Sequence, residues 1–130
     1  MARPSSRHPT ELELEILKVL WNQGPCSVKQ IQEALAGTRG LAYTTVMTML
    51  TIMTNKKYVR RTKAGGSNTY EAAIKQDAAS GNMLQDIVDR VYDGSVPAVM
   101  QQLLESSDLD AHELEAIRQL ISRKQKEQRS

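Results

Sequence analysis

Residues 43–63 read YTTVMTMLTIMTNKKYVRRTK, which is the pattern of a helix followed by a basic strand. At about 100° per residue, its apolar positions fall on one side of a helix that runs roughly from Tyr43 to Lys56. That core face consists of Val46, Met49, Leu50 and Met53. Residues 58–63 are strand-like, and the small residues of 64–67 predict a turn before a return strand. A helix followed by a basic hairpin is the order found in a winged helix-turn-helix.

Two further helices are predicted upstream, and each begins with the spacing of a capping box. Thr10 and Glu13 open the first, which extends over residues 11–23 and is stopped by a Gly-Pro pair. Ser27 and Gln30 open a second, shorter helix. The three helices and the hairpin together predict a mostly α fold with a small antiparallel β-hairpin.

The outer face of the third helix is uncharged. It carries Thr44, Thr48, Thr51 and Asn55, flanked by Thr45 and Met47. A threonine hydroxyl can donate or accept a hydrogen bond and its methyl group can pack on the thymine methyl, so this face can read base edges. The alternative is a solvated threonine-rich face, but threonine is a poor helix former, and four of them favour recognition of a DNA duplex.

Three cations lie on the hairpin, at Arg60, Arg61 and Lys63. They are placed to contact phosphates or to reach into a minor groove, and we predict that they bind DNA together with the outer face of the third helix. Edge strands also carry charge to prevent aggregation, which is the alternative explanation for these residues.

Charge is distributed unevenly along the 130 residues. Residues 1–75 hold 11 Lys and Arg against 5 Asp and Glu, whereas residues 76–130 hold 6 against 10. A positive half beside a negative half is typical of a phosphate-binding domain joined to a module that stays off the duplex. We therefore expect a winged-helix DNA-binding domain over 1–75, with 1–9 flexible, and a helical dimerisation domain over 76–130.

The second half predicts three short amphipathic helices, the last opened by a capping box at Asp110 and Glu113. Fewer than about 60 residues without a metal or disulfide rarely form a sufficient core, so these stripes are expected to pack on a second copy. An intramolecular core is the alternative. The predicted dimerisation residues are Leu84, Ile87, Val88, Val91, Val99, Met100, Leu103, Leu104, Leu114, Ile117, Leu120 and Ile121.

Catalysis, metal binding and cofactors are not expected. His112-Glu113 begins like a zinc-protease motif, but Ala116 stands where the second histidine would be, and His8 lies in the tail. Cys26 is the single cysteine and is expected to be a packing residue. No apolar run approaches the roughly 20 residues of a membrane span, so a cytoplasmic protein without membrane insertion is expected.

Several motifs occur in an order that resembles one known family. They are Thr10–Leu17 leading into Leu20-Trp21, then Gly24-Pro25, Val28-x-x-Ile31, Thr45-Val46-x-Thr48-x-Leu50, Val91–Ser95 and Leu109–Glu115. This order resembles the BlaI/MecI family of penicillinase repressors over about residues 10–124. The resemblance implies a homodimeric winged-helix repressor that binds a palindromic operator, controls a β-lactamase-type or stress-response operon, and is inactivated by proteolysis through a membrane sensor protease system.

The chain also departs from the family pattern. The family often has basic residues at the positions of Met47 and Ile52 and a glycine at that of Lys57, and the Asn-Phe pair of its cleavage point corresponds here to Gln102-Leu103. Copper sensing by C-terminal cysteine pairs, which some relatives use, is not expected. The alternative function is a winged-helix protein-interaction module or a nonspecific DNA-binding protein.

Overall fold

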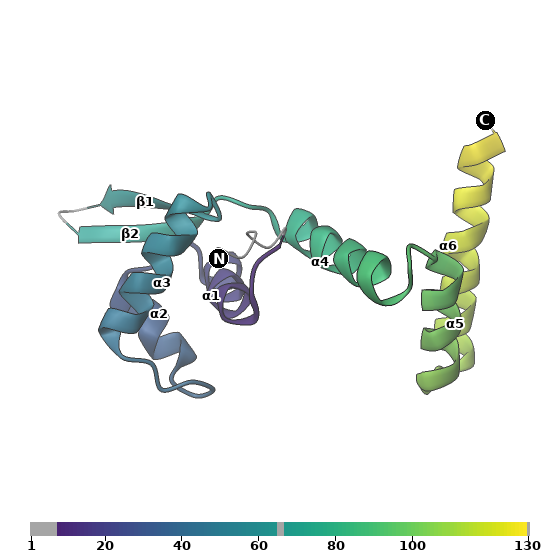
Figure 1. Ribbon diagram of the computed structural model, residues 1–130, viewed down its shortest axis with the longest axis horizontal. Helices are drawn as coiled ribbons and strands as arrows, with labels where there is room; N and C mark the ends of the chain where they lie inside the picture. Colours follow the sequence, from purple (N-terminus) through teal and green to yellow (C-terminus); the bar gives the residue numbers. More distant parts are fainter. Residues whose placement is uncertain (1–7, 65–66, 130) are drawn as a thin grey trace. The chain divides into compact units, whose positions relative to one another are not determined.

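The structure, a computed structural model, describes residues 8–64 and 67–129 (Figure 1). Within these residues, six helices and a two-stranded antiparallel hairpin follow in the order α1-α2-α3-β1-β2-α4-α5-α6. The predicted mostly helical winged fold is confirmed. The two glycines of the expected turn, at 65 and 66, lie outside the described residues.

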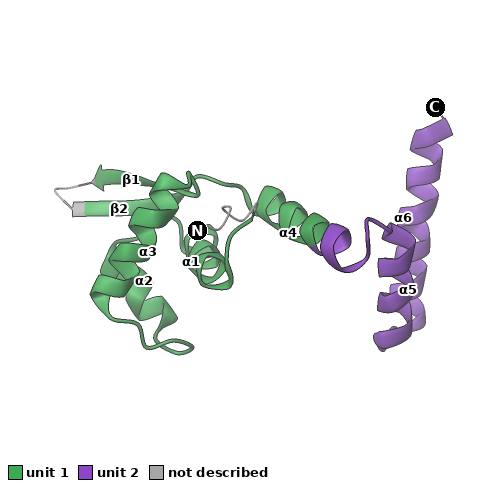
Figure 2. Ribbon diagram, in the orientation of Figure 1, with its two compact units in different colours: residues 1–86 green, residues 87–130 purple. Residues whose placement is uncertain are grey.

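The chain divides into two compact units, residues 1–86 and residues 87–130 (Figure 2). The division falls within α4 (Gln76–Val91), whereas the sequence predicts a domain boundary at 75/76, where that helix begins. The position of the functional boundary therefore stays a prediction.

Capping boxes start the first two helices as predicted. In α1 (Glu11–Gln23), the Thr10 hydroxyl accepts from the backbone N–H of Glu13, and the Glu13 carboxylate accepts from that of Thr10. Ser27 and Gln30 form the same pair at the start of α2 (Val28–Leu35). Each box satisfies N–H groups that a helix N-terminus leaves without partners.

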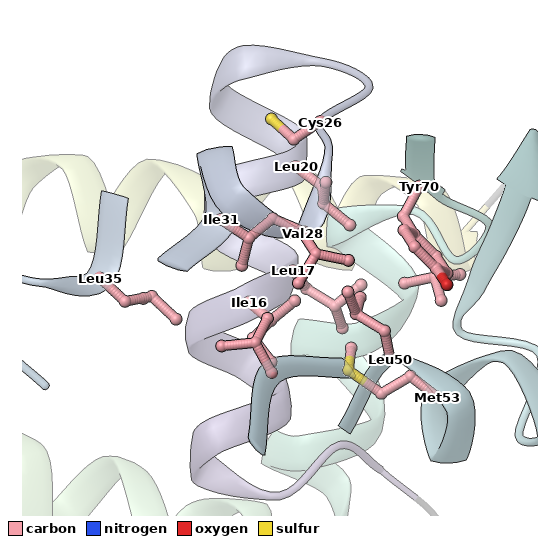
Figure 3. Close-up of a cluster of buried hydrophobic side chains, with 12 residues drawn as sticks. Ile16, Leu17, Leu20, Cys26, Val28, Ile31, Leu35, Leu50, Met53 and Tyr70 are labelled. Atoms are coloured by element: carbon pink, nitrogen blue, oxygen red, sulfur yellow. The ribbon is translucent and has the colours of Figure 1, made fainter. Parts of the chain in front are cut away.

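The third helix, α3 (Tyr43–Asn55), buries one face and exposes the other. Its Val46, Leu50 and Met53 side chains are fully buried, and Met49 is half-buried. The predicted core face is thereby confirmed. These residues join a cluster with Ile16, Leu17, Leu20, Cys26, Val28, Ile31, Leu35, Val59 and Tyr70, and Figure 3 shows side chains of this cluster converging between the helices.

The hairpin consists of β1 (Val59–Ala64) and β2 (Ser67–Ala72), which pair in antiparallel register with Arg61 opposite Tyr70. A third segment joins it, because the backbone of Cys26 exchanges two hydrogen bonds with Tyr70, at N···O distances of 2.9 and 2.7 Å. The link between α1 and α2 is thus tied to the wing, and the buried Cys26 is a packing residue as expected.

A buried ion pair joins the start of α1 to the end of α3. The Glu13 carboxylate is 1% exposed and lies 2.9 Å from the Lys56 ammonium, which keeps 28% of its side-chain surface. Because Glu13 also belongs to the capping box of α1, one carboxylate fixes both the start of that helix and its position against α3.

The N-terminal tail differs in part from the expectation that residues 1–9 are flexible. Residues 1–7 lie outside the described residues, but Pro9 is fully buried and the His8 imidazole lies 3.0 Å from the Asp86 carboxylate. Asp86 of α4 supplies the polar partner of His8, and Pro9 is covered by the rest of the chain.

The second unit contains the last turn of α4, then α5 (Val96–Ser106) and α6 (Ala111–Arg129). Ser95 caps α5 through its hydroxyl, and Asp110 and Glu113 form the predicted capping box of α6. Neither α5 nor α6 has a buried residue in its described part. Most of their large apolar side chains are exposed.

Candidate nucleic-acid interface

All nine side chains predicted to bind DNA lie in the first unit, and all are exposed. Six belong to the outer face of α3 and three to β1. The six are Thr44, Thr45, Met47, Thr48, Thr51 and Asn55, and the three are Arg60, Arg61 and Lys63. The amphipathic pattern of α3 produces this exposure, because its opposite face is packed into the core.

Two of the threonine hydroxyls are bonded to their own helix. The Thr48 hydroxyl donates to the carbonyl oxygen of Thr44 at 2.9 Å, and that of Thr51 donates to the carbonyl oxygen of Met47 at 3.0 Å. Each hydroxyl has a single hydrogen, so both oxygens present only acceptor capacity to solvent.

A groove of about 760 Å³ separates the end of α3 from β1. It brings together four of the predicted residues: Thr51 and Asn55 from the helix, and Arg60 and Arg61 from the strand. Lys57, at the junction of the two elements, also lines it. The result is a polar, cationic groove beside the face of α3 that is predicted to read bases.

The cations around this groove differ in how their charge is balanced. Arg60 pairs with the Glu71 carboxylate directly across the hairpin, at 3.1 Å. Lys57, Arg61 and Lys63 form no ion pair within residues 8–64 and 67–129, and all three are exposed. Lys57, Arg61 and Lys63 therefore carry the positive charge that is most available to a phosphate.

Lys57 has a backbone φ of +67°, in the left-handed region that favours glycine. The backbone N–H of Tyr58 donates to the carbonyl of Met53 at 2.9 Å, which closes the end of α3 around this residue. The resemblance implies a glycine at this position, and the geometry explains why glycine fits. Lysine at this position supplies a positive charge, but its backbone is strained where that of glycine would not be.

Three residues near Met47 are not among those predicted from the sequence to bind DNA. Lys29, Tyr43 and Asn68 line a hollow of about 270 Å³ together with Met47. Lys29 lies in the first turn of α2, where the helix dipole disfavours a cation, and that unfavourable placement is a signal that points to a function. Asn68 had no such signal, because only the hairpin pairing brings it here.

The apolar side chains predicted for dimerisation are mostly exposed. Examples are Val91 at 66%, Leu120 at 58% and Leu84 at 55%. Four of the predicted residues differ: Val99, Met100 and Ile117 are half-buried, and Val88 is buried by the chain itself and only 6% exposed. Gln102 and Leu103, the cleavage position that the resemblance implies, are exposed within α5.

No group of three or more His, Cys, Asp or Glu side chains in the described part of the chain is arranged to hold a metal ion. Burial raises the pKa of the Cys26 thiol, which keeps it protonated and weakly nucleophilic. His112 lies exposed in the first turn of α6. Among the helices of the described residues, none combines the length and apolar character needed to cross a membrane.

Comparison with known proteins gives a consistent result. The family model described as Penicillinase repressor matches residues 9–123. The transcriptional regulator BlaI of Mycobacterium tuberculosis (strain H37Rv) is 30% identical over 114 residues, which cover 86% of this chain and 81% of that protein. The methicillin resistance regulatory protein MecI of Staphylococcus aureus (strain N315) is 20% identical over 112 residues, covering 86% and 91%.

Two solved structures are also similar. The solution structure of monomeric Bacillus licheniformis BlaI in complex with the blaP half-operator is 23% identical, with a TM-score of 0.49, and covers 56% of this chain and 89% of that one. The crystal structure of the transcriptional regulator Tm0710 from Thermotoga maritima is 14% identical, with a TM-score of 0.48, and covers 88% and 78%.

Proposed function

This chain belongs to the penicillinase repressor family, and we propose that it represses transcription as a homodimer bound to a palindromic operator. Members of this family are DNA-binding transcriptional repressors and not enzymes, and this chain is one of them. We further propose the dimer, the residues that contact DNA, and control by proteolysis. A repressor of this kind acts in the cytoplasm, on double-stranded DNA.

The main support for a DNA-binding surface is that the outer face of α3 is exposed and uncharged and lies beside a cationic groove. Side chains without charge on a helix that enters a major groove can discriminate bases, while neighbouring cations bind phosphates without regard to sequence. We assign base reading to the exposed α3 residues and phosphate binding to Arg60, Arg61 and Lys63. Arg60 contributes less to phosphate binding than the other two cations, because its guanidinium is paired with Glu71 in the free protein.

Dimerisation is supported by the exposed apolar surface of α4, α5 and α6. Single soluble chains rarely expose large contiguous apolar patches, and here neither α5 nor α6 buries a residue in its described part. A second copy related by two-fold symmetry would cover these faces. Val88 offers little surface to a second copy, because the chain itself leaves it only 6% exposed.

Two-fold symmetry has a direct consequence for the operator. Two copies of α3 would enter major grooves one helical turn apart, or a multiple of one turn, so each operator half would be the inverted repeat of the other. We propose a winged-helix domain over residues 1–75 for DNA binding and a domain over 76–130 for pairing. The regulated genes are a β-lactamase-type or stress-response operon.

We propose proteolysis between Gln102 and Leu103, triggered by a membrane sensor protease system, as the event that ends repression. Cleavage there would separate α6 and its apolar stripe from the DNA-binding domain, and so would weaken pairing. The bond lies within a helix, which must open locally before a protease can cut it. Mass spectrometry of the protein from induced cells would detect fragments 1–102 and 103–130, and an intact chain during induction would contradict this step.

The test of the function as a whole is selection of genomic fragments by the purified full-length protein at physiological salt. Recovery of a palindrome, with a dimer in sedimentation velocity, supports the proposal. Fragments without a common sequence, bound only at low salt, would instead indicate a nonspecific DNA-binding protein or a protein-interaction module.

A further inference from the structure

Thr48 and Thr51 project from the outer face of α3 with their hydroxyl hydrogens already used. We infer that these two residues select A·T base pairs, by accepting a hydrogen bond from the adenine N6 amino group and by placing their methyl groups against the thymine methyl. This inference rests on the proposed function, because it names the base pairs that the proposed DNA-binding face reads.

The hydrogen-bond geometry determines what each hydroxyl can do. At 2.9 and 3.0 Å from carbonyl oxygens four residues earlier, the Thr48 and Thr51 hydroxyls donate to the helix and retain only lone pairs for an outside partner. In the major groove, guanine presents the acceptors O6 and N7, whereas adenine and cytosine present amino donors. Guanine therefore offers these two oxygens no hydrogen bond.

The methyl groups then separate adenine from cytosine. An A·T pair presents both an amino group and, on the partner base, a methyl group, whereas a C·G pair presents an amino group beside guanine acceptors. Met47 and Ile52, at 42% and 39% exposure, add further apolar surface on either side. A·T pairs alone satisfy both the polar and the apolar parts of this face.

The remaining outer residues do not offset this preference. Bidentate guanine recognition comes mainly from arginine or lysine, and the helix carries neither between residues 43 and 55. Thr44 and Thr45 differ from Thr48 and Thr51, because within the described residues their hydroxyls form no hydrogen bond. The first turn therefore remains able to donate, and the A·T preference is confined to positions facing the second and third turns.

The experiment combines protein variants with base analogues on the selected operator. Purine in place of adenine removes only the N6 amino group, and uracil in place of thymine removes only the methyl group. Thr48→Val removes the hydroxyl but keeps a methyl group, and Thr48→Ser does the reverse. Thr38→Val is the matched control, since its hydroxyl also donates to a backbone carbonyl, at 3.2 Å, but in the turn between α2 and α3.

We expect purine at one half-site position to weaken the wild type about five-fold, the value of one ordinary hydrogen bond. It should weaken Thr48→Ser by a similar factor but leave Thr48→Val unchanged. Uracil should weaken the wild type and Thr48→Val, but not Thr48→Ser. Equal purine effects on wild type and Thr48→Val at every position, or guanine at the positions facing both residues, would overturn the inference. A wild type without sequence preference would instead refute the proposed function.

Discussion

Replacing Lys57 by glycine should raise the stability of the first unit while it weakens DNA binding. The backbone φ of +67° is the cause of the first effect. A left-handed conformation costs an L-residue about 1–2 kcal/mol, and glycine avoids this cost but loses about 0.5–1 kcal/mol through its greater freedom in the unfolded chain. We expect a net gain of about 0.5–1 kcal/mol in the free energy of unfolding.

That gain is large enough to measure by thermal denaturation. For a unit of 86 residues, 1 kcal/mol corresponds to a change of about 4–8 °C in Tm, so Lys57→Gly should melt about 2–8 °C higher. The control is Lys57→Arg, which keeps both the charge and the strained conformation and should melt like the wild type. An unchanged or lower Tm for Lys57→Gly would refute the argument that this residue is strained.

DNA affinity should change in the opposite direction. Lys57 is exposed and lines the groove between α3 and β1, where it can neutralise one phosphate. Each phosphate contact contributes about 0.9 to the slope of log affinity against log salt concentration, so Lys57→Gly should reduce that slope by about 0.9 per subunit. Lys57→Arg should retain it. An identical slope for all three proteins would show that Lys57 contacts no phosphate.

Four further tests address other parts of the structure. Glu13→Ala should lower the free energy of unfolding by about 2–3 kcal/mol, below the range of a fully buried pair because Lys56 is 28% exposed, and urea denaturation measures this loss. Arg61→Ala should weaken binding to every operator sequence alike in titrations, and a change in sequence preference would contradict phosphate binding. Burial raises the pKa of Tyr58, the Glu13 carboxylate raises it further, and Lys56 acts in the opposite direction. The contribution of the Tyr58 phenol to stability is therefore complete below the ordinary phenol pKa and is lost as pH rises through the raised value. Denaturation at alkaline pH can detect this loss. Leu120→Glu should convert the proposed dimer to a monomer in sedimentation velocity, since that side chain is 58% exposed on α6.

Local signals in the sequence were sufficient to predict the helices. The capping boxes at Thr10, Ser27 and Asp110 form as expected, because each depends only on residues three positions apart. The exposed outer face of α3 also follows from periodicity alone. The groups that form such features are neighbours in the sequence, so their spacing alone is enough to predict them.

Features formed by distant residues could not be predicted in this way. The ion pair between Glu13 and Lys56 joins residues 43 positions apart, and the backbone pairing of Cys26 with Tyr70 joins residues 44 positions apart. In neither case does the local sequence indicate which distant residue will be the partner. The burial of Val88 has the same origin, because an apolar stripe does not reveal which of its members the chain itself covers.

Around α3, the residues proposed to read bases and the exposed cations lie on different elements. A cation on the outer face of this helix would bind guanine or a phosphate, and in either case would compete with the proposed readout of bases by threonine. Here the charge lies instead at the junction and on the strand, at Lys57 and Arg61, while α3 has no charged residue from 43 to 55. A substitution at Lys57 can then change the affinity for phosphates without altering which bases α3 is proposed to read. If this separation holds, Lys57→Gly will lower affinity for all operators by the same factor, and any sequence-dependent loss would show that the junction also affects the position of the helix in the groove.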